Sequence, residues 1–278
     1  MFGMATSARP GSPAGPTLGP LLRDWRQRRR LSQLALALEA RVSQRHLSFV
    51  ESGRARPSRE MVLQLAEALG VPLRERNEML LAAGYAPVFA ERPLSDPALD
   101  AARRAVERVL AAHEPFPALA VDRHWTLVAA NRAVGPLLAG AAPALLAPPL
   151  NVLRLTLHPD GVAPRIVNYG QVRTHLLERL HQQVGASGDD ALATLYDELR
   201  GYPPPARDGA RRSPAIASEG AGVFVPLQLA TDDGVLSFLS TTTVFGTPVD
   251  VTLAELALEC FFPADAETAE RLRGMVLR

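Results

Sequence analysis

Gln44 and Arg45 are adjacent polar residues near the expected start of a short helix, and both side chains can recognise nucleic-acid bases. A glutamine amide pairs with the major-groove edge of adenine, and an arginine guanidinium pairs with that of guanine, each through two hydrogen bonds. Ser43 precedes this pair, and Ser48 follows it at a helical spacing that places it on the same polar side. An isolated Gln–Arg pair is more often an ordinary solvated surface, so its meaning depends on the elements that position it.

Two short helices joined by a tight turn are predicted around the pair. Ser32 and Ser43 stand at N-cap positions, where a hydroxyl can accept a backbone N–H that has no partner in the helix. In the second helix, Leu47 and Val50 are three residues apart and therefore share one buried face, which leaves the Gln–Arg pair on another. Gly53 can end that helix without steric cost. This arrangement is typical of a helix that enters the major groove of DNA.

The order of these signals resembles the helix-turn-helix domain of the XRE family, of the Cro and lambda-repressor type. The resemblance is carried by Ser32–Gln33, by the runs Val42–Arg45 and Leu47–Gly53, and by Pro57–Ser58, which opens the next helix. It covers residues 18 to 83. It implies five helices, expected at residues 18–29, 33–40, 44–51, 59–69 and 74–83.

The XRE resemblance also implies how the side chains meet DNA. The glutamine at position 33 would clamp a phosphate, and the residues from Ser43 to Arg45 would face the groove. Phe49 would either meet a thymine methyl group or pack inward. The predicted DNA contacts are Gln33, Ser43, Gln44, Arg45, Ser48, Phe49, Arg54 and Arg56. A further positive footprint is expected from Arg23, Arg26, Arg28, Arg29 and Arg30.

The charge balance supports a basic DNA-binding part, called the reader below, joined to an acidic second part. Residues 1–90 contain 13 Arg against 7 acidic residues, and residues 91–278 contain 17 Arg against 22, so a net charge of +6 stands against −5. The chain has no Lys. This excludes a Schiff base to a pyridoxal cofactor, a P-loop lysine and a Ser-Lys self-cleaving dyad.

The length of 278 residues and the hydrophobic share of 47% are sufficient for two cores. The expected organisation is a disordered tail at 1–17, a DNA-binding domain at 18–84, a linker at 85–95 and a second domain at 96–278. The fold class is an all-α five-helix domain followed by an α+β, PAS-like domain. In the second domain we expect helices at 100–113, 168–184 and 189–200, strands at 118–122, 125–129, 222–230, 235–243 and 249–252, a helix cap at Asn131, and a last helical stretch that begins at Thr252–Glu255.

The second half carries a more particular resemblance, to the MmyB-like transcription regulators. It rests on the runs Ser43–Phe49, Pro72–Asn77, Ala82–Pro87, Asn151–Leu155 with His158–Pro159, and Phe245–Leu256. That family joins an XRE reader to a PAS-like ligand-binding domain, and the resemblance implies a pocket for a small apolar molecule, with a fatty acid as the leading idea. Large apolar residues on strands ordinarily form core, but some could line such a pocket. The residues expected as ligand contacts are Trp125, Phe224, Phe238 and Phe245.

Other functions remain open at this stage. No catalytic group, metal ligand set or cofactor is expected, because His175 and His181 are six residues apart on a predicted helix and face different directions. Cys260 lies in an apolar run and is interpreted as core. The expected protein is a cytoplasmic homodimer, away from the membrane, that binds a double-stranded DNA operator. The rival interpretations are an enzyme with an autoregulatory DNA-binding domain and a protein-binding adaptor.

Overall fold

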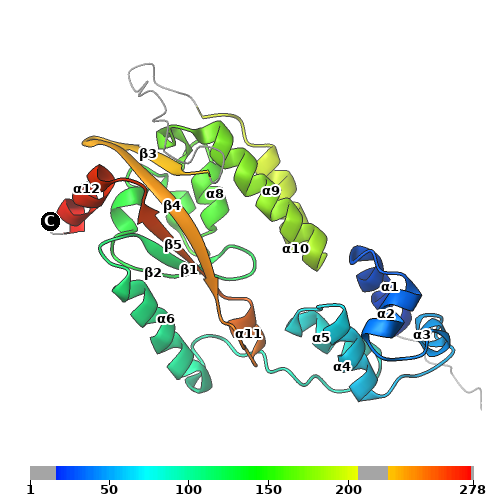
Figure 1. The fold of residues 1–278 in the computed structure, drawn as a ribbon. Coiled ribbons are helices and arrows are strands. Elements are labelled where there is room, and N and C mark those ends of the chain that lie inside the picture. The colour runs from blue at the N-terminus through cyan, green and yellow to red at the C-terminus, as the bar shows by residue number, and fades with distance from the viewer. Residues whose placement is uncertain (1–16, 206–224, 277–278) are drawn as a thin grey trace, which may run out of the picture. The chain divides into compact units, whose positions relative to one another are not determined.

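The computed structural model describes residues 17–205 and 225–276, and the chain divides into two compact units after Ala90 (Figure 1). The tail predicted at residues 1–17 lies, except for its last residue, outside the described residues. Phe224 and the beginning of the strand predicted at 222–230 also lie outside them.

The first unit consists of five described helices, each within one residue of its predicted bounds. They are α1 (Leu18–Arg28), α2 (Gln33–Glu39), α3 (Gln44–Glu51), α4 (Arg59–Ala68) and α5 (Leu73–Ala82). Local chemistry sets three of their starts, because the hydroxyls of Ser32, Ser43 and Ser58 each accept a hydrogen bond from the backbone N–H three residues later, at 3.0 to 3.2 Å. The predicted helix-turn-helix is therefore confirmed as α2 and α3.

One fully buried leucine from each helix meets in a single core. These residues are Leu22, Leu36, Leu47, Leu65 and Leu80. The backbones of α1 and α3 approach each other closely, because a Cβ added to Gly19 would lie 2.5 Å from the carbonyl oxygen of Glu51. Only glycine fits at that position without a shift of the backbone. The end of α3 is thus held tightly against α1.

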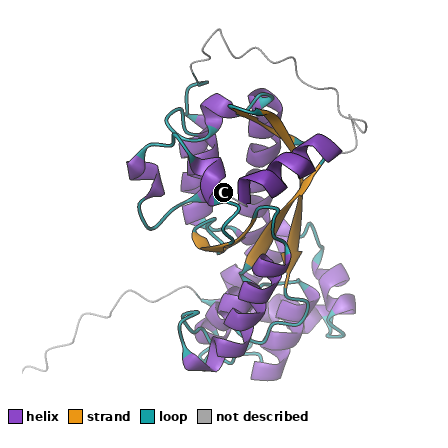
Figure 2. Cartoon of the chain, turned by 90° about the vertical axis from the view of Figure 1, so that its left-hand side faces the viewer, coloured by secondary structure: helices purple, strands orange, loops and turns teal. Residues whose placement is uncertain are grey.

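The second unit is built on a five-stranded antiparallel sheet, whose strands are orange in Figure 2, with the strand order β2-β1-β5-β4-β3 (Figure 1). Its strands are β1 (Ala118–Val121), β2 (Leu127–Ala130), β3 (Leu227–Thr231), β4 (Gly234–Val244) and β5 (Ala257–Pro263). The helices around it are α6 (Asp100–Ala112), α7 (Pro143–Leu146), α8 (Val152–Leu157), α9 (Tyr169–Ser187), α10 (Asp190–Arg200), α11 (Val251–Ala254) and α12 (Ala266–Val276), with 3₁₀ turns η1 (Pro97–Leu99), η2 (Gly135–Leu138) and η3 (Ala163–Arg165). This is the α+β, PAS-like domain that the sequence predicted.

Alternating residues of the strands supply two cores, one on each face of the sheet. On one face, Val106 and Leu110 of α6 pack against Ala118 and Cys260, so the interpretation of Cys260 as a core residue is confirmed. On the other face, a larger core joins residues of β1, β3 and β4 to leucines of α8, α9 and α10.

Two local predictions are wrong. Asn131 does not cap a helix, because its buried amide bonds to the backbone of Leu110, Phe116 and Ala118 and thereby ties the end of α6 to β1. The strand predicted at 249–252 is instead the start of α11, because the carboxylate of Asp250 accepts the N–H of Thr252 at 2.9 Å and caps the turn. The strand that follows, β5, was seen in the sequence only as an apolar run.

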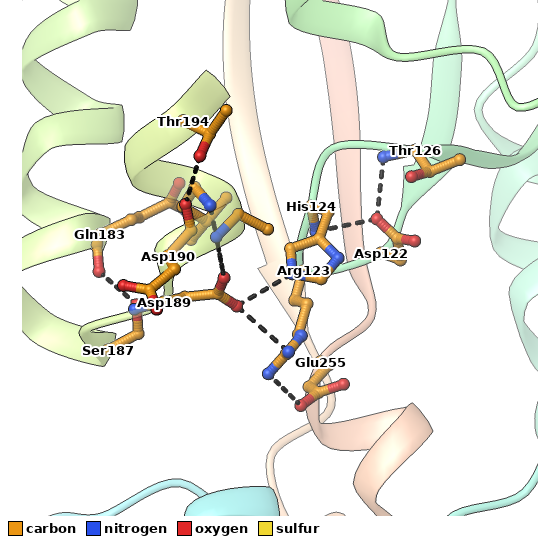
Figure 3. Close-up of polar contacts among 12 residues, drawn as sticks. Asp122, Arg123, His124, Thr126, Gln183, Ser187, Asp189, Asp190, Thr194 and Glu255 are labelled. Carbon is orange, nitrogen blue, oxygen red and sulfur yellow. Dashed lines mark hydrogen bonds and ion pairs between the residues drawn. The ribbon is translucent and has the colours of Figure 1, made fainter. Parts of the chain in front are cut away.

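A polar network fixes the turn between β1 and β2 to the turn between α9 and α10 (Figure 3). One carboxylate oxygen of Asp189 caps α10, and the other lies 2.9 Å from His124 Nε2 and 3.1 Å from the guanidinium of Arg123. Burial acts to raise the pKa of Asp189, but His124 and Arg123 outweigh it and hold that pKa below its usual value. The network sets the position of Trp125, the next residue along the chain.

Candidate DNA interface and ligand cavity

The N-terminal part of α3 presents an exposed polar face. Ser43, Gln44 and Arg45 are exposed, and Ser48 is half-buried one turn further on. The opposite side of the helix is buried through Leu47, Val50 and Glu51. A short helix that exposes amide, guanidinium and hydroxyl groups at its N-terminal end has the chemistry required to read base edges.

Phe49 lies beneath the guanidinium of Arg45, whose central carbon is 5.5 Å from the centre of the phenyl ring. The phenyl ring is half-buried and contacts Arg45, so both possibilities left by the sequence, a thymine contact and inward packing, stay predictions. A cation over an aromatic face is attracted by the ring quadrupole, and the i, i+4 spacing on a helix permits this contact. Arg45 is thereby biased toward one orientation before any DNA is present.

The buried carboxylate of Glu51 connects α1, α2 and α3, three of the five helices of the first unit. Its side chain is 1% exposed, and its carboxylate accepts hydrogen bonds from Arg26 of α1 at 2.7 and 3.0 Å and from the amide of Gln33 of α2 at 2.8 Å. Arg23 Nε lies 3.7 Å from the same carboxylate. Burial acts to raise the pKa of Glu51, but the bonds from Arg26 and Gln33 outweigh it, so the pKa lies below the usual range.

The sequence assigned Gln33 to a phosphate, and the structure places one of its amide hydrogens on Glu51. A side-chain amide has a second hydrogen and a carbonyl oxygen, so a phosphate contact remains compatible with this bond. The pairing fixes the orientation of the amide in the free protein. Glu51 itself was missed by the sequence reasoning, although its spacing of four from Leu47 on the buried stripe of α3 was a usable signal.

The arginines of the predicted positive footprint differ in their contacts within the first unit. Arg26 is bound to Glu51, and Arg29 donates to the carbonyls of Leu69 and Gly70 at 2.9 and 3.2 Å, where α4 ends. Both residues contribute to the fold through these bonds, and their place in the positive footprint stays a prediction. The exposed arginines of the predicted set are Arg23, Arg28, Arg30, Arg54 and Arg56. Arg56 is also anchored, by a bond to the carbonyl of Ala83 and by the ring of Tyr85.

Ser43 has two possible roles, and substitution separates them. Its oxygen accepts the N–H of His46 at 3.1 Å, so Ser43→Ala should destabilise the start of α3 by about 1 kcal/mol. Ser43→Gly should destabilise it by only a few tenths of a kcal/mol, since glycine is tolerated at an N-cap. Equal losses of operator affinity in the two variants, measured by fluorescence anisotropy, would show that the hydroxyl contacts DNA. A loss confined to the alanine variant would leave Ser43 as a cap only.

A cavity of about 80 Å³ lies in the second unit, between the sheet and the segments around α8. Its walls include Leu119, Leu127, Leu155, Leu229, Phe238 and Phe261. Among the described residues that line it, Thr156 is the only one with a polar side chain, and its hydroxyl donates to the carbonyl of Val152 at 2.8 Å. The interior therefore suits an apolar guest and offers no group that would compensate a buried charge.

The expected ligand contacts do not come together at this cavity. Phe238 lines it, whereas Trp125 and Phe245 are not among its lining residues. Trp125 is buried with its indole N–H on Gln183 at 2.9 Å and with the Arg179 guanidinium 4.6 Å from its ring. Phe245 packs against the core on the α6 face of the sheet. The cavity instead takes most of its wall from aliphatic residues that the sequence did not single out.

Two family models match the chain. Residues 102–275 match the ligand-binding domain of the MmyB-like transcription regulators, and this match spans more than half of the 278 residues. The chain belongs to the MmyB-like transcription regulators. Residues 22–76 of this regulator match a helix-turn-helix model. No curated protein matches the chain.

The two matches make this MmyB-like protein a DNA-binding transcription regulator with a ligand-binding domain. Within residues 17–205 and 225–276, no group of three or more His, Cys, Asp or Glu residues is placed to hold a metal ion. The helices in the same ranges include none that is both long enough and apolar enough to cross a membrane.

Proposed function

We propose that this regulator binds a specific DNA operator through the exposed face of α3 and that a small apolar ligand in the cavity alters operator affinity. The observation that carries the first part is the division of α3 into an exposed polar side, from Ser43 to Arg45, and a side locked to α1 and α2 through Glu51. A rigid helix with a preset reading face loses little entropy when it binds.

The predicted contacts fall into base-reading and phosphate-binding roles. Arg45 reads guanine and Gln44 reads adenine, with Ser43 and Ser48 beside them and Phe49 as the support of Arg45. Gln33, Arg54 and Arg56 bind phosphates, which fix the position of the domain on the duplex. Losing a phosphate contact should weaken binding to all sequences, whereas losing a base contact should alter the preferred sequence.

The active form in this proposal is a homodimer. Readers of this type gain affinity and register when two copies occupy half-sites about one helical turn apart. Sedimentation of the full chain with and without operator tests this directly. A monomer bound to a single half-site would contradict it.

The apolar lining of the cavity supports an apolar ligand, and a fatty acid is the leading candidate. At about 80 Å³, the cavity is smaller than the roughly 150 Å³ of an engineered cavity that holds benzene. An acyl chain therefore enters only if the walls move. Native mass spectrometry of protein purified from its own host, followed by denaturing extraction, would reveal whether an acyl chain is carried and whether it is chemically changed, as an enzyme would change it.

Filling the cavity should abolish ligand binding without unfolding the domain. Val152 lines the cavity, and Val152→Phe places a phenyl group in the void, so we expect decanoate affinity to fall at least about tenfold with little change in stability. Isothermal titration calorimetry and thermal unfolding measure the two effects. Val109→Phe is the matched control, because Val109 is exposed on α6. Unchanged decanoate affinity in the Val152 variant would place the ligand elsewhere.

A further inference from the structure

The second half of strand β4 forms an open edge of the sheet. β3 pairs with β4 only from Gly234 to Phe238, whereas β4 continues to Val244 (Figure 1). Every residue from Ser240 to Val244 is exposed, and Val244 is 61% exposed. No described strand pairs with this stretch on the side that β3 occupies earlier in the strand. Its backbone groups on that side are therefore available to another strand.

The pairing of β4 shows which residues present these groups. Neighbouring residues of a strand direct their backbone N–H and C=O groups to opposite sides. The carbonyl of Ser237 accepts the N–H of Ala264, the residue after β5, so the odd-numbered residues of β4 direct their backbone groups toward β5. Ser240, Thr242 and Val244 therefore direct theirs to the open side.

The outer strands of the sheet, in contrast, are bonded by other segments of the chain. Beside β3, the N–H of Val167 donates to the carbonyl of Gln228 at 2.8 Å. Beside β2, the N–H of Leu127 donates to the carbonyl of Leu150, also at 2.8 Å. Proteins commonly cover an edge strand or place charges and prolines on it, because an open edge pairs with other chains. The open stretch of β4, Ser-Thr-Thr-Thr-Val, contains no charge and no proline.

The absence of charge indicates which kind of partner the edge fits. The sequence has no charged residue from Gly234 to Val249. Thr242 contacts Arg179 and Glu259, but these two residues form an ion pair at 2.6 Å and compensate each other. In a symmetric dimer the same surface patch meets itself, so charges on the patch would approach their own copies and repel. A neutral edge avoids this repulsion and offers nothing to a partner selected by charge, which favours a second copy of this chain.

We propose that two copies of this chain pair through Ser240–Val244, antiparallel about a two-fold axis at Thr242, so that their sheets join edge to edge. This inference rests on the homodimer of the proposed function and assigns its interface. Thr242 faces Thr242 of the second copy, and Ser240 faces Val244, so the pairing forms about six backbone hydrogen bonds. The length of the stretch fits, because β4 ends at Val244 and the strand of the second copy stops before it reaches β3, which closes the edge at Phe238.

A cysteine at position 242 tests the register of this pairing. The two Cα atoms of residue 242 would lie about 5.5 Å apart, a separation that a disulfide can span. Full-length Thr242→Cys, oxidised with copper phenanthroline, should therefore give a covalent dimer on a non-reducing gel. The matched control is Val249→Cys, because Val249 is 81% exposed but lies outside the paired stretch. The control should cross-link at least about tenfold more slowly, and wild type should not cross-link because its Cys260 is buried.

Val244→Pro tests the same interface without a cross-link. The N–H of Val244 points to the open side, so proline removes a bond to the second copy and none to β5. Sedimentation velocity over a concentration series should show a dimer dissociation constant at least about tenfold above that of wild type. Thermal unfolding should change little. The Val249→Cys protein, kept reduced, should dimerise as wild type does.

The contrary results separate this inference from the proposed function. If wild type is a dimer, but Val244→Pro dimerises equally well and Thr242→Cys cross-links no faster than its control, the interface lies elsewhere and the homodimer stands. If wild type is a monomer both alone and on the operator, the homodimer fails together with this inference, while the DNA-binding and ligand-binding parts of the proposal stand. If Val244→Pro does not fold, the rate of cross-linking at position 242 decides.

Discussion

Glu51→Ala is expected to destabilise the DNA-binding unit by about 3 to 5 kcal/mol, because it leaves the guanidinium of Arg26 without its carboxylate partner in a nearly buried site. Arg26 is 12% exposed, so water replaces the lost carboxylate poorly. The same substitution frees the amide of Gln33 and unlinks α3 from α2. Hydrogen exchange of the α1, α2 and α3 amides in the full chain measures the loss within this unit.

The control for this experiment is Glu39→Ala, since Glu39 also lies on a helix of the reader but is exposed. It should change the free energy of opening, as measured by hydrogen exchange, by no more than about 0.5 kcal/mol. Equal protection of the Glu51 and Glu39 variants would show that the buried ion pair does not hold the reader together.

The Glu51 pair also predicts a pH dependence with a defined sign. The pKa of Glu51 is lowered in the folded state. Its contribution to folding stability is therefore complete above the unfolded-state pKa of about 4.3 and is lost as the pH falls through the folded-state pKa. The difference in protection between wild type and Glu51→Gln should therefore be constant near neutral pH and shrink below about pH 4. A difference that grows on acidification would contradict the assigned direction.

Arg45→Ala is expected to cost about 1 to 3 kcal/mol at the cognate operator and to relax the preference for one base pair. The physical reason is the loss of two parallel hydrogen bonds to guanine from a guanidinium that Phe49 already orients. The measurement is selection of binding sites from a randomised duplex library with each protein, followed by anisotropy titrations. Arg54→Ala is the contrasting variant. Arg54 is exposed and is proposed to bind a phosphate, so its loss should weaken binding to all sequences alike and reduce the salt dependence of binding by about one phosphate. The same selected motif for wild type and Arg45→Ala would remove Arg45 from base reading.

The helices of the reader could be predicted closely because their determinants are local. Serine caps and leucines at helical spacing act within a few residues, so Ser32, Ser43 and Leu47 were sufficient to place α2 and α3. The partners of Glu51 could not be predicted in this way. Arg26 and Gln33 lie 25 and 18 residues from it in the chain and meet it only after the helices pack.

The second domain shows the same limit. Strand β5 is buried on both faces over much of its length, and Glu259 is its one polar residue, so its sequence is an apolar run without the regular alternation of a half-exposed strand. The cavity is harder still, because a void is a property of side-chain packing across several elements. Phe238 was named from its residue type and does line the cavity, while Trp125 was named for the same reason and is held in the core by Gln183 and Arg179.

The most direct test of the account is the operator affinity of the full chain with and without saturating decanoate, measured by anisotropy in parallel for wild type and Val152→Phe. The account predicts that decanoate changes wild-type affinity by about fivefold or more, in either direction, and leaves the filled-cavity variant unchanged. Unchanged wild-type affinity at ligand saturation would contradict coupling between the cavity and the DNA-reading face.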